Sequence, residues 1–176
     1  MLLNATLSLL LMQQAPAENV DWDAEFGVEE VERDPATGEI PVEPYEQKNE
    51  NAGAKPFTGD DMAETFGGRD GIRQIAERFV EINFADPRIQ GIFAGHDEVR
   101  LRRTIFEQFC YILNAGCDYT GRDMKSSHEG LGSRKADLNA IVENLQQAMR
   151  EQDVPFAAQN RFLSKLAPMS RDVINR

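Results

Sequence analysis

The sequence predicts an all-α protein, because its apolar residues after Pro56 recur at spacings of three and four, the period of an amphipathic helix. No stretch there alternates apolar and polar residues as a half-buried strand does. The charge points to a second division of the chain. The 176 residues have a formal net charge of −11, of which residues 1–65 contribute −12 and residues 66–176 contribute +1. We therefore expect one folded domain over residues 58–176 behind an acidic N-terminal third.

Five helices are expected in this domain. The first ends at Asp86, because the following Pro87 disfavours helical dihedrals. The second begins at Asp97, a good N-cap, and its wide apolar face indicates packing between two partners. Gly130 and Gly132 end a short helix, and Pro168 should kink the last one. The expected ranges are 72–85, 97–114, 124–129, 134–149 and 155–173.

The acidic third divides into two segments. Residues 1–17 are rich in Leu and end in Ala15-Pro16-Ala17, which is typical of a secretory signal with its cleavage site and is too short for a stable membrane span. This predicts an exported, periplasmic protein. The alternative is an apolar tail on a cytoplasmic protein, because no basic residue precedes the apolar run. Residues 18–57 hold few large apolar groups among many acidic ones, so we expect a disordered acidic linker.

Several function classes are excluded or unsupported. An acidic chain is a poor partner for nucleic acid, and no GxSxG, HExxH or phosphate-loop motif occurs. Cys110 and Cys117 lack a metal-ligand spacing and are expected to be ordinary core or loop thiols. On one continuous helix their Cα atoms would be about 10.5 Å apart, beyond disulfide reach. A bridge would require the helix to end between them, which Gly116 permits.

The two histidines are the candidates for chemistry. His128 lies in a short, Gly-bounded helical segment between helices with broad apolar faces, where a neutral imidazole can be an axial ligand of haem iron. The alternative is a capping or surface histidine. His96 lies in a loop before the second helix, where it is expected to be solvated, or else to serve as a second axial ligand.

A family resemblance favours the first interpretation of His128. Residues 60–176 resemble a truncated haemoglobin of group I. The motifs that carry this resemblance, in order, are Phe66-Gly67-Gly68, Asp86-Pro87-Arg88-Ile89, Phe93-Ala94-Gly95, Tyr119-Thr120-Gly121-Arg122-Asp123-Met124-Lys125 and His128-Glu129-Gly130-Leu131-Gly132, with Val154-Pro155-Phe156 and Leu166-Ala167-Pro168-Met169 in the tail.

The resemblance implies a two-over-two helical sandwich that holds one b-type haem. It implies His128 as the proximal iron ligand and Phe93 as the phenylalanine that packs on the porphyrin. The other haem-pocket positions that it implies are Met124, Val80, Leu101, Ile105 and Tyr119. The implied role is reversible binding of O₂, CO or NO at ferrous iron, as in oxygen transport, with an unknown reductase and nitric oxide dioxygenation only as a side activity.

The sequence departs from the family on the distal side. Val80 stands where many members have a tyrosine, and Ile105 stands where they have a glutamine. A hydrogen bond to a polar ligand is worth about 1.5 to 3 kcal/mol, so its loss should speed oxygen dissociation by roughly one to two orders of magnitude. Thr104 or Tyr111 turning inward would supply a donor instead.

Three further expectations complete the interpretation. Arg103, Lys125 and Arg122 are candidates to lie near the haem propionates. A six-coordinate electron-transfer protein, with His96 on the iron, is one alternative. The other is a haem-less helical module whose acidic segment binds a basic partner.

Overall fold

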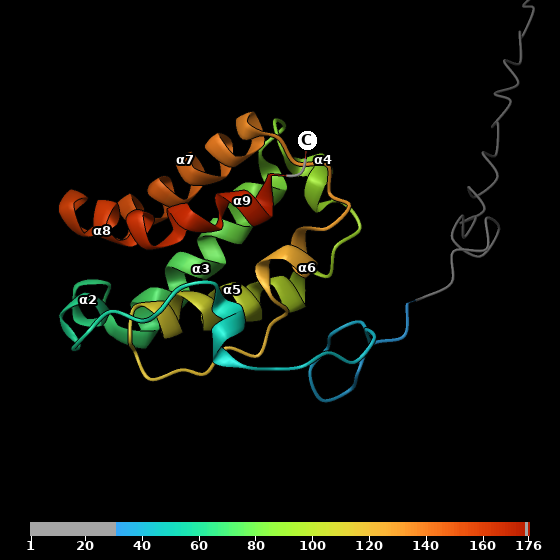
Figure 1. Cartoon of the computed structure of the whole chain (residues 1–176), viewed down its shortest axis with the longest axis horizontal. Helices are drawn as coiled ribbons and strands as arrows, with labels where there is room; N and C mark the ends of the chain where they lie inside the picture. Colours follow the sequence, from blue (N-terminus) through green and yellow to red (C-terminus); the bar gives the residue numbers. More distant parts are fainter. Residues whose placement is uncertain (1–30, 175) are drawn as a thin grey trace, which may run out of the picture. The chain divides into compact units, whose positions relative to one another are not determined.

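The computed structural model describes residues 31–174 and 176. Within these residues the regular secondary structure is all helical, without a strand (Figure 1). The expected signal segment, and residues 18–30 of the expected linker, lie outside this described part. No helix within it is long and apolar enough to cross a membrane. The elements are η1 (Asn49–Ala52), α2 (Asp61–Thr65), α3 (Gly68–Ala85), α4 (Gln90–Phe93), α5 (Glu98–Ile112), α6 (Met124–His128), α7 (Lys135–Glu151), α8 (Phe156–Leu166), η2 (Ala167–Met169) and α9 (Ser170–Val173).

Helix α3 starts at a turn that only glycine can make. Gly67 has a positive φ of 76°, and a Cβ on Gly71 would overlap the carbonyl oxygen of Phe66. The glycine-rich sequence before α3 therefore forms a tight bend. The helix ends at Asp86, as the following proline predicts.

Helix α5 begins as its N-cap predicts and ends earlier than expected. The side chain of Asp97 accepts from the backbone N–H of Val99, 3.3 Å away. Leu113 is the C-cap, and Asn114 takes a left-handed φ of 64°, which turns the chain out of the helix. The chain therefore reverses within the six residues between Cys110 and Cys117.

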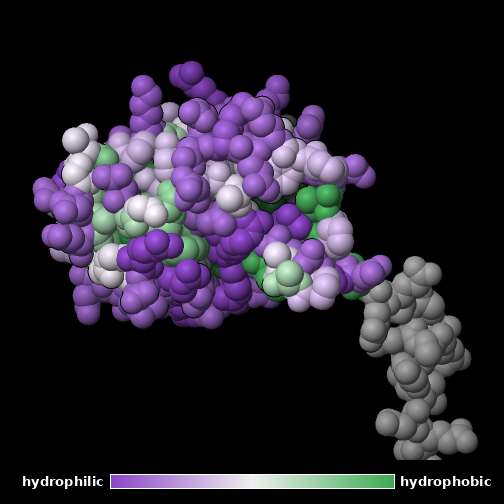
Figure 2. Space-filling model, turned by 90° about the horizontal axis from the view of Figure 1, so that it is seen from below, coloured by the Kyte–Doolittle hydropathy of each residue, from purple (hydrophilic) through white to green (hydrophobic). Residues whose placement is uncertain are grey.

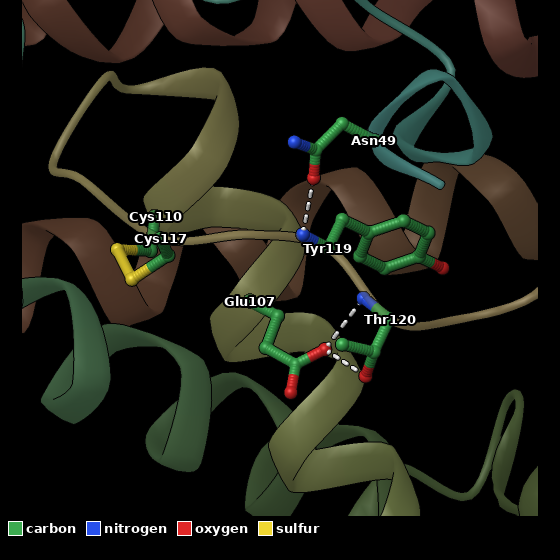
Figure 3. Close-up of a disulfide and its surroundings, with 6 residues drawn as sticks. All are labelled: Asn49, Glu107, Cys110, Cys117, Tyr119 and Thr120. Carbon is green, nitrogen blue, oxygen red and sulfur yellow. Dashed lines mark hydrogen bonds between the residues drawn. A yellow bond between two sulfur atoms is a disulfide. The ribbon is translucent and has the colours of Figure 1, made fainter. Parts of the chain in front are cut away.

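This reversal corrects the prediction of two free thiols. Cys110 and Cys117 form a disulfide with their Cα atoms 5.6 Å apart (Figure 3). The distance on a continuous helix does not apply, because α5 ends between them and Gly116 adds a second positive φ, 76°.

A row of aromatic rings joins the two helical layers. Phe66, just after α2, packs edge-on against Phe162 of α8 with ring centroids 5.3 Å apart. Phe162 packs in the same way on Phe109 of α5 at 5.1 Å, and Phe109 contacts Phe79 of α3 at 5.9 Å. Aromatic side chains bury large apolar areas, so this row is the centre of the core.

Helices α3 and α7 also pack together, antiparallel, through a buried polar pair. Asn144 of α7 donates to the side-chain oxygen of Asn83 at 2.9 Å and to Asp86 at 3.0 Å. At the other end of the contact, Arg78 forms an ion pair with Glu151. Buried amides that are hydrogen-bonded fix the register of two helices in a way that apolar contacts do not.

The N-terminal segment differs from the expected disordered linker over residues 33–57. Glu39 is only 6% exposed and forms ion pairs with Arg103 and Arg100 of α5. Further along, the side chain of Asn51 and all of Ala52 are buried. The segment is held on the domain by ion pairs and hydrogen bonds. Its low content of apolar residues therefore did not predict that it is ordered.

The C-terminal helix pair begins one residue later than its proline suggested. Pro155 is the N-cap of α8 rather than its first helical residue. Pro168 lies in η2, which separates α8 from α9 and accounts for the expected kink.

The contact of Glu39 with α5 should contribute to stability. We expect Glu39→Ala to lower the free energy of unfolding by about 1 to 3 kcal/mol, because it leaves a half-buried arginine with fewer partners. Glu43→Ala, which removes an exposed carboxylate of the same segment, is the matched control. Urea denaturation of both variants measures the difference, and equal stabilities would contradict a packed segment.

Candidate functional site

The site is built around the short helix α6, which places His128. Asp123 is its N-cap: its carboxylate accepts from the backbone N–H of Ser126 at 3.0 Å and from the Ser126 hydroxyl at 2.7 Å. The backbone and side-chain hydrogen bonds from Ser126 hold the pKa of the Asp123 carboxyl below its ordinary value. Gly130 then leaves the helix with a φ of 78°. Both ends of this five-residue helix are therefore fixed by its own sequence.

One hydrogen bond sets the chemical state of His128. Its Nδ1 lies 2.7 Å from the carbonyl oxygen of Met124, one turn earlier. A carbonyl oxygen only accepts, so Nδ1 carries the proton and the lone pair of the neutral ring is on Nε2. The imidazole is half-buried. A backbone carbonyl on the other ring nitrogen is the usual support of a metal-binding histidine.

Met124 itself lies in the core. Its sulfur accepts from Nε2 of Gln108, 3.2 Å away, and Gln108 also donates to the carbonyl oxygen of Ala52 at 2.9 Å. A Cβ on Gly53 would come within 2.9 Å of the Met124 side chain, so glycine is required there. Gln108 thus ties α5, α6 and η1 together. This role could not be predicted, because no sequence motif marks a buried glutamine on a helix.

Tyr119 shapes the chain that leads into α6. It is 5% exposed, its hydroxyl donates to the carbonyl oxygen of Arg122 at 2.9 Å, and its ring covers Gly121, where any side chain would overlap it. Burial raises the pKa of this phenol. Its backbone N–H donates to the side chain of Asn49 at 2.7 Å (Figure 3). The observed contacts of Tyr119 are those of a residue that positions this loop.

The predicted distal residues come from α3 and α5 and are apolar. Val80 is 1% exposed, and Leu101 and Ile105 are half-buried. Thr104 lies between them in sequence, but its hydroxyl bonds to backbone carbonyl oxygens of its own helix at 3.0 and 3.3 Å. Tyr111 packs on the hydrophobic core. Neither side chain that was considered as an inward donor has a contact that favours this role.

Phe93 belongs to α4, which lies with α6 at the end of the molecule away from α2 and α8 (Figure 1). Its ring packs on Phe84 of α3, with centroids 5.6 Å apart, and remains half-buried. Figure 2 shows apolar surface interrupting the polar surface on one face. Half-buried aromatic and aliphatic groups of this kind are what an apolar macrocycle would cover.

The other candidate residues have different surroundings. His96 is exposed. Arg103 binds Glu39 and Glu107, and these contacts, first that with Glu39, hold its pKa above the usual value. Arg122 stacks on Tyr45, 5.0 Å from the ring centroid. Arg103 and Arg122 therefore hold the N-terminal segment, which is a different role from that expected near the propionates.

Among residues 31–174 and 176 no group of three or more His, Cys, Asp or Glu side chains is placed to hold a metal ion. Two surface cavities of about 590 and 460 Å³ are lined by other residues, chiefly arginines of α3 and α5 in the first and residues 34–47 in the second. A single histidine donor, with half-buried apolar groups on α4 and α5, fits a haem better than a bare ion.

A two-layer helical sandwich with a histidine on a short helix defines the class of truncated globins. The profile of the bacterial-like globin family matches residues 61–175. The chain belongs to this family, and its relatives place it in group I of the truncated haemoglobins. Globins are haem proteins, so a haem-protein function follows from this membership.

Individual relatives are also truncated hemoglobins. The group 1 truncated hemoglobin GlbN of Mycolicibacterium paratuberculosis is 27% identical over 107 residues, covering 61% of this chain and 79% of that protein. GlbN of Nostoc commune is 24% identical over 115 residues, 65% of this chain and 98% of that one. Two solved structures are similar in fold, each covering 65% of this chain and 98% of the other. They are truncated hemoglobin from Tetrahymena pyriformis, at a TM-score of 0.62 and 22% identity, and the 2/2 hemoglobin from Synechococcus, which carries covalently attached heme, at 0.60 and 23%.

Proposed function

We propose that this globin binds one b-type haem and reversibly binds a diatomic gas, O₂, CO or NO, with His128 as the proximal ligand. The observation that carries the proposal is the hydrogen bond from His128 Nδ1 to the Met124 carbonyl oxygen. It fixes the tautomer and the orientation of the ring before any metal binds. When bound, the haem would supply a ferrous iron with one coordination position for the gas.

The remaining residues would orient the group and exclude water. Phe93, held on Phe84, offers an aromatic face. Leu101 and Ile105 of α5, with the buried Val80 of α3, offer aliphatic surface on the proposed distal side. Because the Thr104 hydroxyl bonds to its own helix, this lining supplies no strong donor to a polar ligand. We infer fast oxygen release and a preference for CO.

The observations disfavour the other roles. Glu39 of the acidic segment is already paired with Arg100 and Arg103 of α5, which disfavours a role of the segment in capturing a separate basic partner. An apolar pocket holds oxygen weakly, which disfavours nitric oxide dioxygenation as the main activity. His96 is exposed, which disfavours a six-coordinate haem.

We also propose export to the periplasm. The Cys110–Cys117 disulfide supports this, because disulfides persist in oxidising compartments. N-terminal sequencing of the mature protein tests the proposal: a start at Glu18 supports it, and an intact Met1 in the soluble fraction contradicts it.

Replacing the proposed iron ligand tests the function. We expect wild type produced with a supply of haem to show a Soret band, and His128→Ala to lose it while keeping its helical circular dichroism. His96→Ala is the control and should retain the wild-type spectrum. A colourless wild type with normal helicity, or an unchanged band in His128→Ala, would overturn the proposal.

Restoring a distal hydroxyl tests the apolar pocket. Val80→Tyr should slow oxygen dissociation about ten- to a hundredfold, because a phenol can donate to bound oxygen. Val80→Phe enlarges the same buried side chain without a donor, so the ratio of the two rates isolates the hydroxyl. Stopped-flow measurement gives both rates, and equal rates would show that position 80 does not face the ligand.

A further inference from the structure

The disulfide lies at the edge of a surface cavity that the proposed haem function does not use. The cavity has a volume of about 590 Å³, within the range of small-molecule sites, and Cys117 is one of its lining residues. Its charged lining residues are four arginines and three carboxylates, namely Arg69, Arg73 and Glu77 of α3, Arg102, Arg103 and Glu107 of α5, and Asp118 of the loop. Two of the carboxylates are engaged, because Glu107 pairs with Arg103 and Asp118 accepts from Asn49. One cysteine of the disulfide thus lines a ligand-sized space.

Arg69 and Arg73 make this cavity a candidate site for an anionic ligand. Arg102 is paired with Glu98, but no carboxylate of the described residues lies within ion-pair distance of Arg69 or Arg73. Arg73 is held in place by Phe106, whose ring centroid lies 3.8 Å from its guanidinium carbon. Two guanidinium groups with no carboxylate partner among the described residues, one of them fixed on an aromatic ring, can bind carboxylates in fork geometry.

The two sulfurs differ in accessibility. Cys110 is fully buried, at 0% exposure, within α5. Cys117 is half-buried in the loop after the helix and borders the cavity. Thiol–disulfide exchange depends on which sulfur a thiolate can reach, so attack is directed to Cys117.

We propose that the Cys110–Cys117 disulfide is an exchange site for an anionic thiol, which binds the arginines of this cavity and attacks Sγ of Cys117. The incoming thiol loses its proton and forms a bond to Cys117 Sγ. The bond between the two cysteine sulfurs breaks, and Cys110 leaves with the electron pair and takes up a proton. A second thiol releases Cys117 in the same way, so two thiols are oxidised to one disulfide and the protein gains two thiol groups.

Exchange would break the covalent link between α5 and the loop after it, which is also held by hydrogen bonds. Three residues after Cys117, the backbone N–H and the hydroxyl of Thr120 donate to Glu107 at 2.9 and 2.7 Å (Figure 3). The carbonyl oxygen of Thr120 accepts from Tyr45 at 3.0 Å. Without the disulfide, hydrogen bonds would still hold the loop against α5 and the N-terminal segment, including those that Asn49 makes with Asp118 and with the backbone N–H of Tyr119. The cavity therefore gives an anionic thiol access to the join between α5 and the chain that leads to α6.

The test uses the full-length protein and two thiols of different charge. Glutathione carries a net negative charge near neutral pH, whereas 2-mercaptoethanol is neutral as a thiol. We expect Arg69→Gln/Arg73→Gln to slow reduction by glutathione roughly tenfold, because electrostatic attraction raises the local concentration of the anion, and to leave reduction by 2-mercaptoethanol nearly unchanged. Arg150→Gln/Arg171→Gln removes two exposed charges outside the cavity lining and is the matched control.

Two further measurements keep the proposal falsifiable if the arginine variant folds poorly. In wild type, added salt should slow glutathione more than 2-mercaptoethanol. Mass spectrometry of the trapped mixed disulfide should find glutathione on Cys117. Glutathione on Cys110, equal effects of salt on both thiols, an equal slowing of both thiols in the cavity variant, or two free thiols in the protein as purified would each overturn the proposal.

Discussion

The row of rings from Phe66 through Phe162 and Phe109 to Phe79 is the contact on which the rest of the structure depends. It joins both helical layers near α2 and α8. Helices α4 and α6 lie toward the other end of the domain (Figure 1), and each carries one half-buried candidate for the site, Phe93 and His128.

The short helix α6 has no long apolar face of its own, so it is positioned by its neighbours. Gln108 connects it to α5 and η1, and Tyr119 orders the chain before it. The disulfide and the Glu107–Thr120 hydrogen bonds hold that chain against α5. The N-terminal segment then covers the same region from outside. The geometry of the histidine is therefore a property of loops and polar contacts as much as of helices.

The sequence could predict what has a local signature. The apolar period located α3, α5 and α7, and Gly130 and Gly132 marked the end of the short helix of His128. Ordering of residues 33–57 could not be predicted, because Glu39 finds its arginines more than 60 residues away. The disulfide was missed because it depends on where α5 ends, and the left-handed Asn114 that ends it is not a glycine.

We propose that the imidazole of His128 holds the haem iron. Replacing it in a His128→Gly variant and then supplying free imidazole tests this most directly, because the lost ligand is returned without the polypeptide. We expect the Soret band to disappear in the variant and to return with imidazole, while the helical circular dichroism stays constant. A full Soret band in His128→Gly before any imidazole is added would contradict it.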